Sequence, residues 1–341
     1  MNKQVDIAVV GATGAVGETM IDILAERDFP VRNLFPLASS RSAGTTIRFK
    51  GRSLQVEDLE AFDFSQAQIA LFSAGGSVSE VYAPRAAQAG CVVIDNTSCF
   101  RYEDDIPLVV PEVNPGALQD YQTRNIIANP NCSTIQMVVA LKPIYDAVGI
   151  ERVNVCTYQA VSGAGKRAIE ELAAQTANLL NARPIETECY PKQIAFNVLP
   201  QIDVFEDNGY TREEMKMVWE TKKILEDDAI LVNPTAVRVP VFYGHSEAVH
   251  IETRDKISAD AVKSLFQKAS GIVVMDERAP GGYPTAVTDA AGKDPVFVGR
   301  IREDISHPRG INLWVVADNV RKGAALNSIQ IAEELLTNYF K

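Results

Sequence analysis

The motif NPNCST, residues 129–134, places a cysteine between two different patterns. It follows the short apolar run NIIA and precedes the helix-like run TIQMVVALKPIYD. A cysteine here would lie at the N-terminal end of a helix, where unpaired amide donors and the helix dipole lower the pKa of a thiol and favour the thiolate. We therefore predict that Cys132 is a nucleophile and that the neighbouring Asn131 donates to a developing oxyanion.

Four further cysteines are scattered along the chain: Cys91, Cys99, Cys156 and Cys189. No two cysteines have C-x-x-C spacing and no histidine lies close to them in sequence, so we expect free thiols in a reducing compartment and no metal site. Cys91, Cys156 and Cys189 lie in or beside apolar strand patterns, and we interpret them as inert, buried side chains.

A nucleophilic thiolate needs an acid–base partner, and the chain contains three histidines. His250 lies in the alternating run AVHIET and His307 in the turn SHPRG, so both are interpreted as structural. His245 follows Gly244 in RVPVFYGHSEA, where glycine permits a sharp turn of the backbone. We select His245 as the candidate acid–base residue, and its position alone fits a structural role equally well.

The N-terminal run VDIAVVGATGAVG combines a buried strand with three regularly spaced glycines. A strand, a tight turn and a helix start place backbone N–H groups against a pyrophosphate at the positive end of the helix, as in a Rossmann domain. The spacing G-x-x-G-x-x-G is a variant of the usual G-x-G-x-x-G that suits NADP, and a turn that needs glycine only for packing is the alternative. The predicted cofactor-binding residues of this loop are Gly11, Thr13, Gly14, Ala15, Val16 and Gly17.

The second strand, expected near residues 34–38, ends in ASSRSAG rather than in an acidic residue. NAD-specific domains place a carboxylate here to bind the adenosine ribose, whereas a guanidinium suits the 2′-phosphate of NADP. We therefore predict NADP as the cofactor. A glycine pair in SAGGSVS follows a later strand and suits either a cofactor contact or a simple turn. The predicted contacts in these two segments are Ser39, Arg41, Ser42, Ser73 and Gly75.

A nicotinamide site, a thiolate and a histidine together indicate a reaction that passes through a thioester. A thioester is less resonance-stabilised than an ester, so its carbonyl carbon accepts a hydride more readily and phosphate displaces the sulfur reversibly. These residues do not specify the acyl group.

Two successive patterns of elements must position these residues. Up to about residue 127, short apolar runs alternate with helix-length polar segments, which indicates β-α units and a parallel sheet. From about residue 153 the strand runs are longer and mixed, namely VNVCTYQAV, VRVPVFY, AVHIET, GIVVMDE, VFVGRI and INLWVVAD, which favours a larger antiparallel or mixed sheet. Helices are expected over residues 166–181, 211–227 and 323–339, the second opening with a capping box from Thr211 to Glu214.

Length and charge limit the class of protein. The chain has 341 residues, which suits two domains, and a net charge of −11 with its 33 lysines and arginines scattered. This charge argues against nucleic acid or an anionic membrane as the main partner, so an anionic substrate must meet a local group of positive side chains. The chain opens on a strand, and no apolar run approaches the roughly 18 residues of a spanning helix, so we expect a cytoplasmic protein.

Five motifs, GATGAVG, NPNCST, TYQAVSGAGK, ETKKI and RVPVFYGHS, strongly resemble the aspartate-β-semialdehyde dehydrogenase family in the same order over nearly the whole chain. The resemblance implies an α/β fold like that of glyceraldehyde-3-phosphate dehydrogenase. Its parts are a Rossmann NADP-binding domain over residues 1–131, completed by a C-terminal helix over residues 320–341, and an α+β catalytic and dimerisation domain over residues 132–319.

The resemblance also implies an activity. A homodimer would carry out the reversible, NADPH-dependent reduction of L-aspartyl-4-phosphate to L-aspartate 4-semialdehyde and inorganic phosphate. This reaction serves the biosynthesis of lysine through diaminopimelate, and of threonine, methionine and isoleucine.

Roles for individual residues follow from the same resemblance. Cys132 is the nucleophile, His245 the acid–base catalyst, and Gln159 helps to position the acyl intermediate and the nicotinamide. The family often has cysteine where this chain has Ala236, a departure that leaves the nucleophile unaffected. The implied cofactor-side residues of the catalytic domain are Ser162, Gly163, Gly165 and Asn319.

The resemblance also implies the substrate-binding residues, among them the positive side chains that an acidic protein needs to bind phosphate. Arg101 and Lys223 would bind phosphate, and the adjacent Lys222 leaves open which lysine does so. Glu220 would hold the substrate ammonium, and Arg238 the carboxylate, which a bidentate guanidinium fits.

Three other functions were weighed. N-acetylglutamyl-phosphate reductase shares this chemistry, but its acylated substrate lacks the ammonium that Glu220 would bind. A catalytically silent NADP-binding relative would not need Cys132, Gln159, Arg238 and His245 together. A cysteine hydrolase would leave the glycine loop unexplained.

Overall fold

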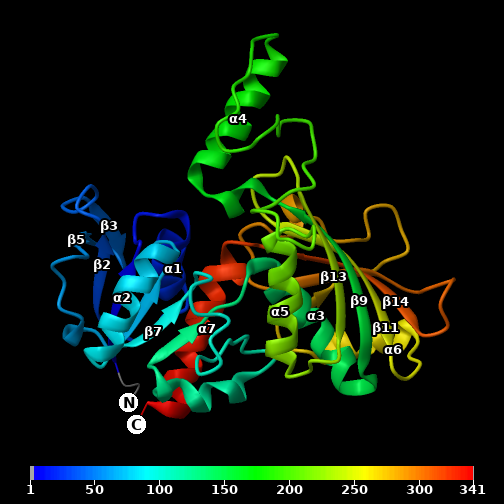
Figure 1. Cartoon of the computed structure of the whole chain (residues 1–341), viewed down its shortest axis with the longest axis horizontal. Coiled ribbons are helices and arrows are strands. Elements are labelled where there is room, and N and C mark those ends of the chain that lie inside the picture. The colour runs from blue at the N-terminus through cyan, green and yellow to red at the C-terminus, as the bar shows by residue number, and fades with distance from the viewer. Residues whose placement is uncertain (1–3, 341) are drawn as a thin grey trace. The chain divides into compact units, whose positions relative to one another are not determined.

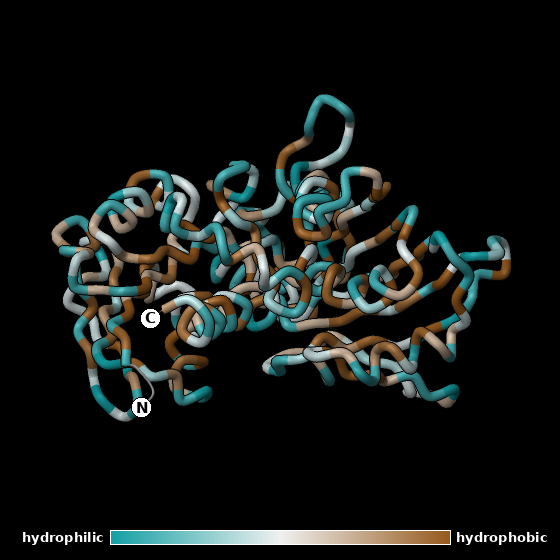
Figure 2. Tube along the Cα trace, turned by 90° about the horizontal axis from the view of Figure 1, so that it is seen from below, coloured by the Kyte–Doolittle hydropathy of each residue, from teal (hydrophilic) through white to brown (hydrophobic). Residues whose placement is uncertain are grey.

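The computed structural model describes residues 4–340 and divides into two compact units. Unit 1 contains the described residues up to Asn131 together with those from Ala324 onward, and unit 2 consists of Cys132–Gly323 (Figure 1). Hydrophobic stretches run inside each unit and hydrophilic stretches form the outer loops (Figure 2). The predicted α/β class is confirmed.

Unit 1 is built around a six-stranded sheet with the strand order β5-β2-β1-β6-β7-β8. All neighbouring strands in it are parallel, as predicted. The central strands are buried along their whole length because helices cover both faces of such a sheet. The strands are β1 Val5–Val10, β2 Val31–Ala38, β5 Glu57–Asp58, β6 Ile69–Phe72, β7 Val92–Asp95 and β8 Ile126–Ala128; β3 Thr46–Phe49 and β4 Arg52–Gln55 form a separate hairpin.

The C-terminal segment packs into unit 1. Ile329, Ile331 and Leu335 are fully buried in the same core as β1 and its neighbours, and α7 contacts α1 and β7. The helices of unit 1 are α1 Ala15–Glu26, α2 Gly76–Gln88 and α7 Leu326–Glu334, with 3-10 turns at Phe64–Gln66 and Pro115–Thr123 and a π-helical turn at Leu335–Tyr339. A further π-helical turn, Arg321–Ala325, begins in unit 2 and ends in unit 1.

Unit 2 contains a mixed six-stranded sheet with the order β10-β9-β11-β14-β13-β12. β9 pairs in parallel with β10 and β12 with β13, and the other pairs are antiparallel, so the predicted mixed sheet is confirmed. The strands are β9 Ile150–Gln159, β10 Leu231–Arg238, β11 His245–Thr253, β12 Ile272–Val274, β13 Val296–Glu303 and β14 Gly310–Ala317.

One predicted strand is wrong in its bounds. The run VRVPVFY was expected to be a strand, but β10 ends at Arg238. Pro240 has no N–H to continue the ladder. The chain turns instead, and the next two carbonyls, of Val241 and Phe242, accept from Val161 and Ser162 at distances of 2.9 and 3.1 Å. This turn delivers the chain to the first residue of β11.

Helices cover one face of the mixed sheet. α3 (Cys132–Val148) lies against the central strands, α6 (Ala259–Lys268) against β12 and β13, and α5 (Arg212–Leu225) against α3 and β10. The predicted capping box from Thr211 to Glu214 is present at the start of α5. α4 (Lys166–Leu180) projects from the rest of unit 2 (Figure 1) and has a small core of its own. A 3-10 turn at Val161–Ala164 precedes α4, and a π-helical turn lies at Ala286–Ala290.

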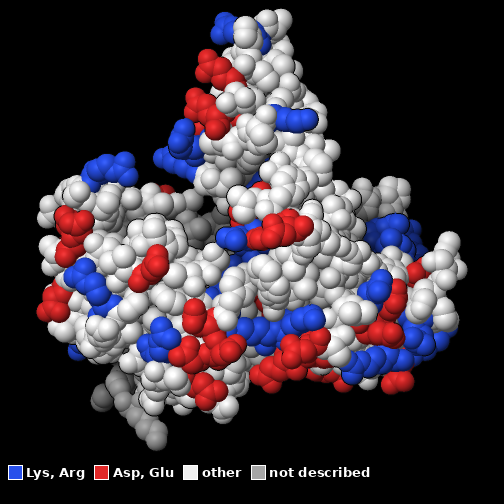
Figure 3. Space-filling view, viewed as in Figure 1, with Lys and Arg blue, Asp and Glu red and all other residues white. Residues whose placement is uncertain are grey.

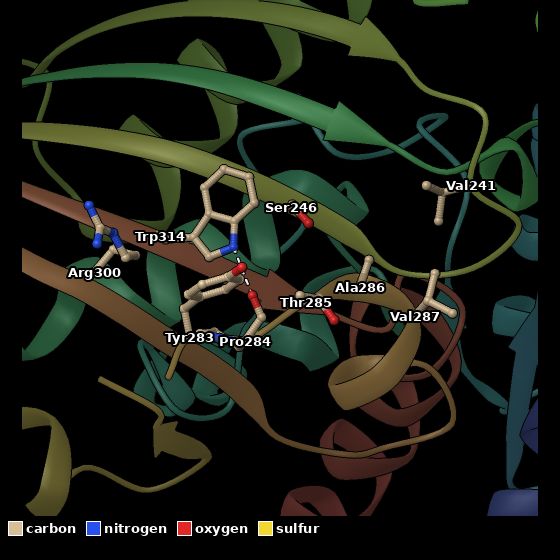
Figure 4. A pocket seen from close by; sticks show the side chains of 9 residues that line it. All are labelled: Val241, Ser246, Tyr283, Pro284, Thr285, Ala286, Val287, Arg300 and Trp314. Atoms are coloured by element: carbon tan, nitrogen blue, oxygen red, sulfur yellow. Dashed lines mark hydrogen bonds between the residues drawn. The ribbon is translucent and has the colours of Figure 1, made fainter. Parts of the chain in front are cut away.

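The other face of the mixed sheet carries large apolar side chains. A cavity of about 490 Å³ opens on it, lined among others by Ser246, Tyr283 and Trp314 (Figure 4). The Trp314 indole Nε1–H donates to the carbonyl of Pro284 at 2.9 Å, and the Tyr158 ring centroid lies 5.6 Å from that of Trp314. A partly exposed aromatic face of this kind indicates a contact surface.

The surface is otherwise charged and mixed. Acidic and basic side chains are interspersed over the face drawn in Figure 3. Among residues 4–340, no helix has the length and apolar character needed to cross a bilayer.

Candidate active site

Cys132 is the first residue of α3, after the short turn that follows β8. The predicted strand, turn and helix around this thiol are confirmed. Backbone N–H groups of a first helical turn have no partner within their own helix, so they favour a negative charge at this position. The residue is half-buried.

The asparagines around Cys132 differ in role. Asn129 is buried in a chain of amides in unit 1: its Nδ2 donates to Asn96 Oδ1 at 3.0 Å, and Asn327 Nδ2 donates to its Oδ1 at 2.7 Å. Arg101 Nη2 donates to the carbonyl of the same Asn96 at 2.8 Å. Asn96 therefore fixes both Asn129 and the Arg101 guanidinium. The first asparagine of the NPNC motif thus has a structural role, which was not predicted from the sequence. Asn131 is also buried.

His245 and Gln159 meet at the ends of adjacent strands of unit 2. The Gln159 Nε2 atom lies 3.5 Å from His245 Nε2, and the Ala160 N–H donates to His245 Nδ1 at 3.0 Å. Burial lowers the pKa of His245 to about 3, helped by the positive charge of Arg238 and opposed by Glu213. The imidazole is therefore neutral near pH 7 in the free protein.

The Gln159 side chain is fixed from both sides. The Thr157 hydroxyl donates to Gln159 Oε1 at 3.0 Å, and Gln159 Nε2 donates to Glu213 Oε1 at 3.0 Å. Lys216 holds the other oxygen of Glu213 at 3.1 Å. Glu213 was missed by the sequence analysis, which read the Thr-Arg-Glu-Glu run only as a helix cap. Glu214 forms the cap, whereas the preceding Glu213 accepts a hydrogen bond from Gln159 in the site.

Arg238 ends β10 opposite Gln159 and is buried. Its Nη1 donates to the carbonyl of Ala160 at 2.7 Å, which fixes one edge of the guanidinium. A Cβ at Gly163 would lie 3.1 Å from Arg238 Nη1 and 3.5 Å from the His245 ring, so the glycine lets the backbone approach both side chains. Unit 2 therefore brings Gln159, Arg238, His245 and Gly163 together.

The loop before α4 is tied to the strand of His245. The Asn319 side chain is buried, bonds the Ser162 hydroxyl at 2.9 Å and accepts from the Gly244 N–H at 2.9 Å. Asn319 and Ser162 thereby fix the residue that precedes His245. Gly165 adopts φ +91° with nothing close to it, so glycine is needed there for the backbone conformation alone.

Glu220 and Lys223 lie one turn apart on α5, as predicted. Glu220 is fully buried and Lys223 is half-buried. Lys222 Nζ donates to the carbonyl of Asp228 at 2.8 Å, at the C-terminal end of the helix. This bond engages Lys222, and the assignment of the phosphate to Lys223 stays a prediction from the resemblance.

The glycine loop of unit 1 borders a separate cavity of about 490 Å³. Gly11 has φ +86°, and a Cβ there would lie 3.0 Å from the Ala74 backbone nitrogen; a Cβ at Gly17 would lie 2.2 Å from the Gly11 carbonyl oxygen. The loop is thus closed tightly against both strand and helix, and its geometry fits a dinucleotide cradle. The lining residues are Gly11, Thr13, Gly14, Ala38, Ser39, Ser40, Arg41, Asp58, Leu59, Glu60, Ser73, Ala74, Val78 and Tyr82.

This lining differs in part from the prediction. In the described part of unit 1, the predicted contacts Ala15, Val16, Gly17, Ser42 and Gly75 lie outside it. Two carboxylates, Asp58 and Glu60, line the cavity beside Arg41. They lie far from the ASSRSAG segment in sequence, on and just after β5, and the parallel pairing of β5 with β2 brings them close.

The five cysteines have free thiols, as predicted. Cys91 is buried, and burial raises the pKa of its thiol. Cys156 is half-buried, however, and Cys189 is exposed in an irregular segment after α4, so the expectation of a buried strand position for Cys189 is wrong. The ECYPK run resembles the start of a strand, but the proline beside it prevents one.

Gly323 lies close to the proposed nucleophile. A Cβ at this position would lie 2.8 Å from Cys132 Cβ and 3.2 Å from its Cα. We expect Gly323→Ala to displace the thiol and to lower kcat by about 10- to 100-fold, with a loss of about 1–3 kcal/mol in the free energy of unfolding. Steady-state kinetics and urea denaturation measure these effects.

A matched control for that variant is Gly116→Ala, because a Cβ at Gly116 meets nothing within 4 Å. The control should keep both kcat and stability. Wild-type kcat in Gly323→Ala would show that the added methyl group does not displace the thiol.

Two family models match the chain. Residues 6–121 match the semialdehyde dehydrogenase NAD binding domain, and residues 141–322 match the semialdehyde dehydrogenase dimerisation domain. With the fold and the site above, these matches define the class: a semialdehyde dehydrogenase that binds a nicotinamide dinucleotide.

Individual relatives narrow this class. The aspartate-semialdehyde dehydrogenase of Legionella pneumophila is 66% identical over 98% of this chain and 96% of its own. The crystal structure of aspartate semialdehyde dehydrogenase II from Vibrio cholerae, complexed with ASA, has a TM-score of 0.98 at 64% identity and covers 99% of this chain and 100% of its own. The enzyme of Candida albicans with NADP has a TM-score of 0.75 at 26% identity over 98% of each chain. The chain belongs to the aspartate-semialdehyde dehydrogenase family, as its motifs predict.

Proposed function

We propose that the protein catalyses the reversible, NADP-dependent reductive dephosphorylation of L-aspartyl-4-phosphate to L-aspartate 4-semialdehyde and phosphate, through a thioester on Cys132. The observation that carries the proposal is the buried group of Gln159, Arg238 and His245 in the same unit as a thiol at a helix N-terminus. Family membership favours this reaction over the reduction of N-acetylglutamyl phosphate, over hydrolysis and over a silent NADP-binding role.

Cys132 begins the chemistry. Its thiolate attacks the acyl carbon of aspartyl phosphate, a carbon–sulfur bond forms, and the bond to the phosphate oxygen breaks. The amide donors of the first turn of α3 and the side chain of Asn131 stabilise the oxyanion of the tetrahedral intermediate. When bound, the nicotinamide supplies the hydride that reduces the thioester carbon.

His245 is the proposed general acid–base catalyst. Because its imidazole is neutral in the free protein, it can hydrogen-bond the oxygen on the reacting carbon and exchange a proton with it as the intermediate collapses. Gln159 adds a fixed amide beside it, since Thr157 and Glu213 prevent that amide from rotating.

The charges of the substrate have separate partners. The free edge of the Arg238 guanidinium binds the α-carboxylate, with the other edge anchored on Ala160. Glu220 binds the α-ammonium, which distinguishes a free amino acid from an acetylated one. Arg101 and Lys223 bind the phosphate group, and the carbonyl of Asn96 anchors Arg101.

NADP is the proposed cofactor rather than NAD. Ser39, Ser40 and Arg41 line the cavity beside the glycine loop and offer hydroxyls and a guanidinium to a 2′-phosphate. The presence of NADP in the Candida albicans relative supports the choice. Asp58 and Glu60 share this lining, and we propose that the guanidinium and hydroxyls offset their charge.

The assignment of this reaction also leads to proposals for the roles of the two units, the dimer contact and the pathway. We propose that unit 1, with the C-terminal segment, is the cofactor-binding domain and that unit 2 is the catalytic and dimerisation domain. The aromatic open face of the mixed sheet is the proposed homodimer contact. The enzyme is cytoplasmic and serves the synthesis of lysine through diaminopimelate, and of threonine, methionine and isoleucine.

One set of assays tests the reaction and the cofactor together. Purified protein receives aspartate semialdehyde with NADP or NAD, with and without phosphate, and N-acetylglutamate semialdehyde in parallel. We expect phosphate-dependent NADPH formation from the aspartate compound and a preference for NADP in kcat/KM. Because a charge-assisted hydrogen bond contributes about 1.5–3 kcal/mol, Arg41→Ala should lower that preference by roughly 10- to 100-fold.

The control is Arg48→Ala, which removes an exposed guanidinium of β3 outside the cavity lining. It should keep the wild-type preference. Equal use of NAD and NADP by the wild type would disprove the cofactor assignment, and turnover without phosphate or only with the acetylated compound would disprove the reaction.

A further inference from the structure

A buried acid lies among the proposed catalytic residues of unit 2. Glu247 is the third residue of β11 and is 0% exposed. Its side chain shares a face of the strand with His245, two residues before it, because side chains alternate along a strand. This face points toward α3, and the Gln136 side chain of that helix lies near the Glu247 carboxyl.

The surroundings of Glu247 offer it no cation. Across the sheet it faces Thr157 on β9 and Val315 on β14. On α3 the first two turns present Ser133, Thr134 and Gln136, which are buried and uncharged. Within the described residues, neither carboxyl oxygen of Glu247 has a hydrogen-bond partner at normal geometry.

The titratable groups on the elements that pack against β11 do not compensate a charge at Glu247. On α3 they are the thiol of Cys132, Lys142, which pairs with Asp146, and Tyr145 near the end of the helix; on β9, Arg152, Cys156 and Tyr158 alternate onto the opposite face of the sheet and Glu151 lies at the far end of the strand; and on β11 itself the imidazole of His245 is neutral. Burial raises the pKa of Glu247 well above the ordinary value for a glutamate, with only the Gln136 amide acting against it. An isolated carboxylate would be very costly here, which favours the protonated, uncharged acid in the native protein.

The contacts of Glu247 lead to three proposed catalytic residues. Gln136 lies one helical turn after Cys132, and its Nε2 donates to the His245 carbonyl at 3.5 Å. Thr157, directly across the strand pair, orients the Gln159 amide. Residues opposite each other on one face have Cβ atoms about 4.5–5.5 Å apart, so these side chains support one another.

We propose that Glu247 is a positioning residue that works as an uncharged carboxylic acid, filling the space between Gln136 and Thr157 and so holding Cys132, His245 and Gln159 in register. Its uncharged state also keeps a negative charge away from the first turn of α3, where it would oppose a thiolate. The inference rests on the roles proposed above for those three residues.

The first test separates an uncharged supporting side chain from a carboxylate and from a position with no supporting role. Glu247→Gln keeps shape and neutrality, so kcat and KM should stay within about two-fold of wild type. Glu247→Ala removes the support, and because a misplacement of about 1 Å costs up to 100-fold, kcat should fall by roughly 10- to 100-fold while KM changes little. Glu252→Gln, on the same strand but half-buried, is the control and should behave as wild type.

The second test uses stability and does not depend on the reaction. A carboxyl with a raised native pKa binds more protons folded than unfolded, so the stability of the wild type falls as pH rises above about 4.3, the value of an unfolded glutamate. Glu247→Gln lacks this loss. The melting temperature of the variant should match the wild type near pH 4 and exceed it by several degrees at pH 8.

Each outcome bears on the proposal. Wild-type kcat in Glu247→Ala, a large loss of kcat in Glu247→Gln, or parallel stability curves for Glu247→Gln and wild type would overturn it. If Glu247→Ala fails to fold, the glutamine variant and its pH curve still decide. A failure of the proposed reaction would show instead as full activity in a variant without the Cys132 thiol.

Discussion

Replacing Cys132 by alanine abolishes turnover and leaves cofactor binding intact. Without sulfur no thioester forms, and direct reduction of aspartyl phosphate or oxidation of the semialdehyde has no covalent route, so we expect kcat to fall by at least about 10⁴-fold. The glycine loop and the other residues that line its cavity lie in unit 1, whereas Cys132 begins unit 2, so the Kd for NADP should stay within about two-fold. Stopped assays measure the residual rate, and quenching of protein fluorescence measures NADP binding.

A second cysteine provides the control. Cys189→Ala removes an exposed thiol after α4 and should keep wild-type kcat. Mass spectrometry of the wild type, quenched in acid after mixing with acyl phosphate, should show a mass increase on the peptide that contains Cys132. Turnover above about 1% in Cys132→Ala, or an acyl group on another cysteine, would refute the assignment of the nucleophile.

The structural setting of Cys132 was visible in the sequence because its signal is local. A short strand, a turn of asparagine and proline, and a helix follow one another within about twenty residues, and each is set by neighbouring residues. The glycine loop is local in the same sense. The positive φ of Gly11 and the close packing of Gly17 are requirements that only glycine meets.

The sequence does not show that Gln159 and Arg238 lie beside His245, because their proximity depends on the order of the strands in the sheet. Gln159 ends β9, Arg238 ends β10 and His245 begins β11, and the order β10-β9-β11 makes these ends neighbours. Nothing in the local pattern of each strand specifies which strand lies beside it. The resemblance to a family supplied these residues, and their neighbour Glu213 was missed because its own signal was that of a helix start.

Glu247 shows a limit of pattern reading of another kind. The alternation in HSEAVHIET places His245, Glu247, Val249 and Ile251 on one face, and that face is buried. A glutamate among such positions is ordinarily assigned to solvent, because an ionised carboxyl is rarely buried. The alternation therefore describes the buried face correctly. Burial of a glutamate on that face conflicts with its residue type only if the carboxyl is charged.

His245→Asn should cause the second largest loss. The Asn Oδ1 can accept the Ala160 N–H in place of His245 Nδ1, so the local fold is kept, but the nitrogen beside Gln159 is lost. Because general acid–base catalysis typically contributes 10²–10⁴-fold, kcat should fall by about that factor with little change in KM. His307→Asn, in the turn between β13 and β14, is the matched control and should keep wild-type kcat.

The pH dependence distinguishes a buried catalyst from a solvent-exposed one. Since the pKa of His245 is lowered to about 3, wild-type kcat/KM, which reports the free enzyme, should show no decline from this residue between pH 8 and about pH 5. The unfolded chain takes up a proton at about pH 6.5, so wild-type stability falls as pH drops from about 6.5 toward 3, by up to about 1.4 kcal/mol per unit. His245→Asn escapes that loss, and its urea midpoint should therefore decline less than that of the wild type below pH 6. A kcat/KM limb near pH 6.5 that disappears in the variant would place the imidazole in water and contradict its role as a neutral, buried group.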